Sequence, residues 1–271
     1  MAELLKRENG SLVYYISPQF LTFSGVRHAF FTRKGGVSSG IFESLNFRFS
    51  GGDERGKVLK NYAIAAAELG GEPENIVRAT QKHTDIIKTV DAAVPGGSGF
   101  NIEEEGPVDA LITAKPGIVL TGFFADCQIL LIYDHKCRIA AVVHAGWRGV
   151  EKEIVRKVIE RLAEMGSKPS DLTVAVGPSI CRRCFETDDD VPERLSAVYG
   201  DQINEFIYRE GDKWHIDLKS ITYSTLLQLG VLPYNIDISS LCPRCGDGEL
   251  FWSHRRDGEA RGVNAAMIMM T

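Results

Sequence analysis

Short runs of apolar and β-branched residues, separated by glycine-rich or polar turns, recur along most of the chain. Such runs predict β-strands, whereas apolar residues at helical spacing predict helices. The predicted strands are residues 26–32, 76–79, 86–90, 110–113, 118–124, 129–133, 138–143, 172–176, 236–239 and 262–270. The predicted helices are residues 57–69, 150–165, 188–199 and 218–229. Residues 95–106 predict an acidic surface loop.

Strands and helices alternate without the regular rhythm of a β-α-β protein. The chain has no internal repeat and no linker rich in proline, glycine or serine. We therefore predict an α+β fold with mixed sheets, in which residues 1–271 form a single domain.

Composition narrows the function classes. The chain has 271 residues, of which 44% are hydrophobic and 25% charged, which is enough to build a sizeable core. Its net charge of −5 argues against general nucleic-acid binding, which requires a basic surface. The N-terminus lacks the apolar region of a signal peptide, and no apolar run reaches the ~18 residues of a membrane span. We therefore expect a cytoplasmic protein without a membrane partner, whose cysteines are thiols or metal ligands.

A cysteine and a histidine stand at matching distances from the centre of a predicted hairpin. If His135 and Lys136 form a two-residue turn, Cys127 lies directly opposite His144 on one face of the hairpin. Opposed Cβ atoms lie about 4.5–5.5 Å apart, which allows a thiolate and an imidazole to bind one zinc ion. The spacing therefore predicts that these two residues are metal ligands.

His83 is the candidate third ligand, in the loop segment Gln81-Lys-His-Thr-Asp85. Three protein ligands and an open fourth position are typical of catalytic zinc, which lowers the pKa of its water to about 7. Each residue also has a simpler explanation. Cys127 would then be a buried thiol, His144 a core histidine and His83 a surface loop residue.

The segment after His144, Ala145-Gly-Trp-Arg-Gly149, joins a predicted strand to a predicted helix. Glycines allow close backbone approach, and free N–H groups at a helix start favour an anion. Arg148 adds a fixed positive charge. We therefore predict a phosphate or carboxylate beside the metal.

Several sequence blocks together resemble the YfiH/YlmD family, also called the polyphenol oxidase laccase-domain or purine nucleoside phosphorylase family. The blocks are Gln81-Lys-His83, Ala125-Asp-Cys127, His144-Ala-Gly-Trp-Arg-Gly149, Gly177-Pro-Ser-Ile180 and Phe251-Trp-Ser-His-Arg-Arg-Asp-Gly258. Residues 32–46 are similar to the N-terminal block of this family. The resemblance runs from about residue 26 to the C-terminus.

The resemblance implies a four-layer α/β/β/α sandwich. It also implies a purine nucleoside enzyme that uses phosphate to cleave adenosine, inosine, guanosine and methylthioadenosine, and water to deaminate adenosine. Copper-dependent phenol oxidation has been attributed to the family as well. Nucleosides and phosphate are therefore the expected partners.

Motif positions carry these roles onto this chain. The resemblance makes His83, Cys127 and His144 the zinc ligands. Arg33, Asn46 and Arg148 match motif positions near the expected pocket, and we predict that they contact phosphate or ribose. Asp126, beside the cysteine ligand, is a candidate for moving protons. The sequence departs from the family at His254, where tyrosine is usual.

Three alternatives stay open at this point. Cys127 and His144 could form a metal-independent dyad in a cysteine hydrolase, such as an amidase linked to peptidoglycan editing. Copper could replace zinc, because the Irving–Williams order favours it, although three ligands fall short of a multicopper cluster. The chain could also be a non-enzymatic protein that binds a metal or a partner.

A second cysteine pattern consists of Cys181-Arg-Arg-Cys184 and Cys242-Pro-Arg-Cys245. Two Cys-x-x-Cys pairs are typical of a structural zinc site. The 57 residues between them exceed the usual spacing of about 15–20, which favours four unrelated thiols. Zinc content separates the two interpretations: about two ions per chain would favour a second site, and about one would count against it.

Overall fold

The computed structural model describes residues 3–91 and 107–271. The predicted acidic loop at 95–106 lies outside the described residues. Within the described part of the chain, no helix has the length and apolar character needed to cross a membrane.

The first of two large sheets is mixed, with β4 parallel to β7 and the other neighbours antiparallel. In spatial order its strands are β1 (Leu5–Asn9), β2 (Leu12–Ile16), β3 (Val26–Phe31), β15 (Asn264–Met270), β7 (Val119–Phe124) and β4 (Ile76–Arg78).

The second large sheet is also mixed, with parallel pairs at its two edges and antiparallel pairs between. In spatial order its strands are β14 (Ile236–Ile238), β10 (Leu172–Val176), β8 (Gln128–Asp134), β9 (Ile139–Ala145), β6 (Ala110–Thr113) and β5 (Ile87–Thr89).

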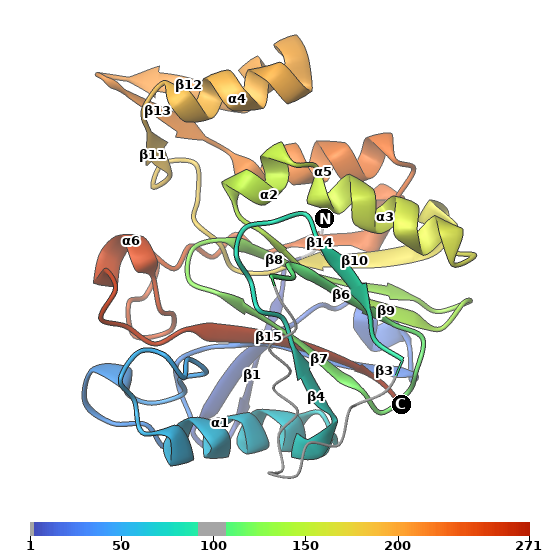
Figure 1. The fold of residues 1–271 in the computed structure, drawn as a ribbon, viewed down its shortest axis with the longest axis vertical. Helices are drawn as coiled ribbons and strands as arrows, with labels where there is room; N and C mark the ends of the chain where they lie inside the picture. The colour runs from blue at the N-terminus through green and yellow to red at the C-terminus, as the bar shows by residue number, and fades with distance from the viewer. Residues whose placement is uncertain (1–2, 92–106) are drawn as a thin grey trace.

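The two sheets face each other, with helices on both outer faces (Figure 1). Helix α1 (Arg55–Glu68) covers the first sheet. Helices α2 (Trp147–Glu151), α3 (Ile154–Glu164) and α5 (Leu218–Gln228) cover the second. The expected four-layer α/β/β/α arrangement with mixed sheets is confirmed.

Burial on both faces explains why the central strands read as continuous apolar runs. In β15, Ala266 and Ile268 pack between the two sheets, whereas Ala265 and Met267 pack toward α1. Because successive side chains point to opposite faces, every residue of such a strand must be apolar or satisfied.

A small third sheet stands away from the sandwich (Figure 1). It consists of β11 (Glu186–Thr187), β13 (Lys213–Ile216) and β12 (Ile207–Glu210), with α4 (Asp190–Tyr199) beside it. The last helix, α6 (His254–Asp257), precedes β15. The 3-10 helices are Phe20–Thr22, Gly40–Phe42, Pro73–Asn75, Pro169–Asp171, Gly200–Glu205 and Pro233–Asn235.

The sequence pattern missed β1, β2 and the three strands of the small sheet. All five residues of β1 are exposed, and both residues of β11 are half-buried. Such strands lack the apolar signal on which the prediction relied. Their existence depends on pairing with neighbours.

The predicted helix at 150–165 is wrong in its continuity. The structure divides it into α2 and α3, because Glu153 adopts a left-handed conformation with φ 57°. The Glu153 carboxylate accepts a hydrogen bond from Arg156 Nε at 2.7 Å. The break sets Lys152 toward the His83 loop, where its Nζ donates to the His83 carbonyl.

The predicted hairpin register is also wrong. His144 pairs with Ile129, and the turn contains four residues rather than two. Asp134 explains the longer turn, since its Oδ1 accepts from the backbone N–H groups of Lys136 and Cys137. Cys127 therefore precedes β8 instead of lying in the hairpin ladder.

Candidate metal centre

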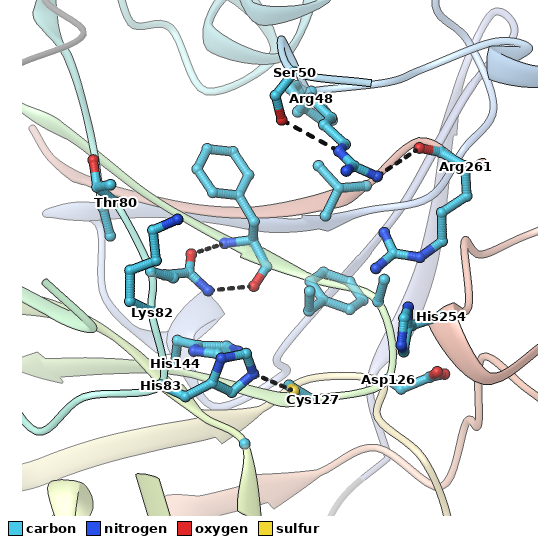
Figure 2. A pocket seen from close by; sticks show the side chains of 18 of the residues that line it. Arg48, Ser50, Thr80, Lys82, His83, Asp126, Cys127, His144, His254 and Arg261 are labelled. Atoms are coloured by element: carbon cyan, nitrogen blue, oxygen red, sulfur yellow. Dashed lines mark hydrogen bonds between the residues drawn. The ribbon is translucent and has the colours of Figure 1, made fainter. Parts of the chain in front are cut away.

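A cavity of about 780 Å³ opens where the ends of the two large sheets meet the loops before β5 and β8. His83, Cys127 and His144 lie together at its wall (Figure 2). Its volume is within the range of ligand pockets, roughly 300–1,000 Å³.

The three predicted ligands converge although they come from separate segments. Their ligand atoms all lie within 4.8 Å of one another. The distance from Cys127 Sγ to His83 Nε2 is 3.7 Å, and the two imidazole rings are nearly perpendicular at 71°. Two imidazoles and a thiolate are donors that zinc prefers, and three of them leave one coordination position open. The residues therefore fit a catalytic type of zinc site.

Asp109, which the sequence analysis missed, positions both histidines. Its Oδ1 accepts from His144 Nδ1 at 2.8 Å and from the His83 backbone N–H at 3.1 Å. Its Oδ2 accepts from both the backbone and the hydroxyl of Thr84 at 2.7 Å. With Nδ1 bonded to Asp109, Nε2 of His144 is the nitrogen left to bind a metal. A carboxylate behind a metal-binding histidine is the usual way to fix its ring.

Further contacts hold the His83 loop against the sandwich. The Gln81 amide makes two hydrogen bonds with the Phe123 backbone on β7, at 2.6 and 2.8 Å. From the helix side, Lys157 Nζ binds Asp85 at 2.5 Å. The loop is therefore attached to both large sheets and to α3.

Backbone geometry near the ligands is unusual. His83 and Asp126 have φ values of 58° and 95°, in the left-handed region that non-glycine residues seldom adopt. Such conformations persist where surrounding contacts enforce them, often at functional sites. At Gly146, an added Cβ would lie 2.8 Å from Cys127 Sγ and 2.9 Å from His83 Cδ2. The site therefore needs glycine there.

Electrostatics favour a thiolate at this position. Burial raises the pKa of Cys127, but the charge of His144 and hydrogen bonds from His144 and His83 lower it to about 6. Burial lowers the pKa of His144, but Cys127 and Asp109 raise it to about 9. Burial likewise raises the pKa of Asp109, and hydrogen bonds from His144 and Thr84 hold it below its usual range. A deprotonated sulfur is the form that binds a metal.

Asp126 lies at the same wall, next to the cysteine ligand (Figure 2). Its Oδ2 accepts from the Arg255 backbone N–H at 2.6 Å. Its other oxygen, Oδ1, is buried and has no hydrogen-bond partner among the described residues. An unpaired buried oxygen is costly, so it is a candidate to bond with a ligand.

Arginine side chains give the cavity a positive wall. Those that line it are Arg48, Arg55, Arg78, Arg148, Arg255 and Arg261. In the described part of the chain, Nε and Nη1 of Arg78 and Nε of Arg261 are buried without a hydrogen-bond partner. Arg78 lies between Phe49 and Phe123, 5.3 Å from each ring centroid. Buried donors without acceptors point to an anionic ligand.

Of the three residues predicted to contact phosphate or ribose, only Arg148 lies at the cavity wall. Arg148 lines the cavity and stacks on Trp147 at 4.3 Å. Arg33 and Asn46 are not among the described residues that line it. The Arg33 guanidinium binds the Glu43 carbonyl and stacks 3.6 Å from the Trp252 ring.

Asn46 is buried and shapes the cavity from behind. Its Oδ1 accepts from the backbone N–H groups of Arg48 and Val263, and its Nδ2 donates to Asp53 at 2.8 Å. Asn46 therefore fixes the loop that carries Arg48.

Comparison with known proteins places the chain in a family. Residues 27–271 match the family described as multi-copper polyphenol oxidoreductase laccase. A purine nucleoside phosphorylase of Deinococcus radiodurans is 34% identical over 90% of this chain and 88% of its own. Adenosine deaminase RL5, from an unknown prokaryotic organism, is 32% identical over 85% of this chain and 88% of its own.

A solved structure has the same fold as this chain. YlmD from Geobacillus stearothermophilus matches with a TM-score of 0.90 at 29% identity, covering 99% of each chain. Sequence and fold thus agree over nearly the whole length, and the chain belongs to the laccase-like YfiH/YlmD family.

Proposed function

We propose that this protein is a zinc-dependent purine nucleoside enzyme. It would cleave adenosine, inosine, guanosine and methylthioadenosine with phosphate, and deaminate adenosine with water. The names of two relatives, a purine nucleoside phosphorylase and an adenosine deaminase, support the class of substrate. The observation that carries the proposal is the convergence of His83, Cys127 and His144 at the wall of an arginine-lined cavity.

His83, Cys127 and His144 would hold the zinc ion. Zinc bound there supplies Lewis-acid chemistry beside the substrate. Asp109 keeps both histidines oriented, so the donor set needs little rearrangement. Asp126 Oδ1, which is buried at the same wall, is the group that we propose holds or moves a proton.

Phosphate would bind to the arginines. Arg78 and Arg261 have buried N–H groups without described acceptors, and phosphate oxygens match guanidinium donors. Arg148 adds charge at the side of the cavity formed by α2. Phe49 and Phe123 line the same cavity and offer apolar surface that a purine can contact.

The test is a product assay with adenosine, run with and without phosphate, on chelator-treated and zinc-reloaded protein. We expect adenine and ribose 1-phosphate only when phosphate is present, whereas deamination by water to inosine does not require it. Both activities are expected to disappear with the metal and to return with zinc. Full activity in metal-free protein would contradict the proposal.

That contradictory outcome would favour a cysteine hydrolase instead. One observation favours this second candidate: half-buried Cys127 and buried His144 shift each other's pKa toward a thiolate–imidazolium pair. Such a pair is an activated nucleophile without any metal. Trapping a covalent intermediate on Cys127 in metal-free protein would support it.

Arg261→Ala is expected to raise the KM for phosphate by roughly tenfold or more, because a charged hydrogen bond to phosphate is lost. Deamination without phosphate should change much less, and the zinc content should stay the same. Arg161→Ala, on the exposed face of α3, is the matched control. An unchanged KM in Arg261→Ala would remove this residue from the phosphate site.

A further inference from the structure

Four cysteines meet outside the cavity wall that carries His83 and Cys127. The Sγ atoms of Cys181, Cys184, Cys242 and Cys245 all lie within 4.8 Å of one another. Cys184 and Cys242 are buried, Cys181 is half-buried and Cys245 is exposed. The fold therefore brings the two Cys-x-x-Cys pairs together, although the 57 residues between them favoured four unrelated thiols.

Distances between the sulfurs fit a single tetrahedral ion. Cys181 Sγ lies 3.7 Å from Cys245 Sγ. Bonds of about 2.3 Å from zinc to four sulfurs give a tetrahedron with edges of about 3.8 Å. A disulfide needs about 2.05 Å, so the 3.7 Å pair is not bonded.

The backbone around the thiols forms two tight turns that resemble metal-binding knuckles. Within the first pair, Cys184 N donates to Cys181 O at 2.9 Å. Within the second, Gly246 N donates to Cys242 O at 2.8 Å, and a Cβ at Gly246 would lie 2.6 Å from that oxygen. The two turns are joined by a hydrogen bond from Cys181 N to Cys242 Sγ at 3.3 Å. N–H groups directed at sulfur stabilise metal-bound thiolates.

Nearby cations match the charge of such a site. A zinc ion with four thiolates carries a formal charge of about −2. Arg183 and Arg244 lie within the two Cys-x-x-Cys segments, and the neighbouring thiols raise the pKa of each guanidinium. The two cations offset this charge.

We propose that these four cysteines bind a second, structural zinc ion. The site has four protein ligands and no open position, so its role differs from that of the cavity site. It would join the segment after β10 to the segment before α6. The first segment and α6 itself contact Asp126: Ile180 N donates to its carbonyl, and Arg255 N to its carboxylate. The second ion would therefore brace one side of the cavity from behind.

The experiment measures zinc per chain by mass spectrometry of metals in three full-length proteins. We expect about two zinc ions in the wild type and one in Cys245→Ser. Cys137→Ser, which changes an exposed cysteine outside the cluster, should keep both. One zinc ion in both the wild type and Cys245→Ser would overturn the proposal, as would iron in place of zinc.

Cys127→Ala offers a second measurement that leaves the four cysteines intact. Zinc X-ray absorption of this variant should report only sulfur neighbours, at about 2.3 Å. Absence of zinc from the variant would overturn the second site. Because the cavity ligand is already removed, this result is independent of whether the proposed enzymatic function holds.

Discussion

Cys127→Ala is expected to lose both phosphorolysis and deamination by on the order of 1,000-fold or more, together with the zinc held by His83 and His144. The sulfur is the one anionic donor of the three, and two neutral imidazoles alone hold zinc weakly. The measurement is the initial rate on adenosine, with and without phosphate, beside the zinc content of the same sample.

Cys137→Ala is the matched control for that variant. Cys137 is an exposed thiol at the far end of the same hairpin, where its Sγ donates to the Gly166 carbonyl. Its removal should leave rates and zinc content at wild-type values. If Cys127→Ala kept as many zinc ions per chain as the wild type and most of its activity, the sulfur would have no role in the site.

Asp109→Asn is expected to lower the affinity for the cavity zinc by about 10–100-fold and to reduce activity in parallel. Each oxygen of Asp109 accepts hydrogen bonds, from His144 and His83 on one side and from Thr84 on the other. An amide supplies one oxygen and one NH₂, so either orientation sets a donor against a donor. The His144 ring then loses its fixed orientation, or the His83 loop loses a backbone hydrogen bond.

Excess zinc separates this positioning role from a general loss of folding. Activity of Asp109→Asn should recover in part as zinc is added, which a misfolded protein would not do. Asp134→Asn is the control, because Asp134 is equally buried and caps the turn at the opposite end of the hairpin. Equal zinc loss in both variants would show that burial of the carboxylate, not its bond to His144, matters.

Much of the fold could be predicted from apolar runs. Strands such as β7 and β8 lie between two packed layers, so their pattern is strong and local. Exposed β1 and the short β11 lack such a pattern, because pairing rather than burial defines them. Glu153 carries no local signal for the left-handed turn that separates α2 from α3.

The metal ligands were predicted through a hairpin register that was wrong. Cys127 and His144 still meet. Gln128 is the last residue of β8 to pair with β9, opposite Ala145, so the next step along the chain sets Cys127 beside Gly146, close to His144. The absence of a side chain at Gly146 makes room for the sulfur. His83 could be added through family resemblance alone, since no local pattern brings its loop to the hairpin.

Asp109 could not be predicted, because an isolated aspartate before an apolar strand has no distinctive pattern. A metal-binding histidine almost always bonds a partner through its other ring nitrogen, so a search for a carboxylate near the predicted ligands could have found it. Arg33 and Asn46 were chosen by motif position. The structure instead brings Arg48 and Arg261 to the cavity wall, from the neighbouring loop and the segment before β15.

The proposed function requires that His83, Cys127 and His144 hold one zinc ion. The most direct measurement is anomalous X-ray scattering from a crystal, with data recorded above and below the zinc absorption edge. We predict a strong peak that appears only above the edge, about 2.0 Å from one nitrogen of each imidazole and about 2.3 Å from Cys127 Sγ. A map without that peak, from crystals grown with zinc, would show that these three residues do not form a zinc site.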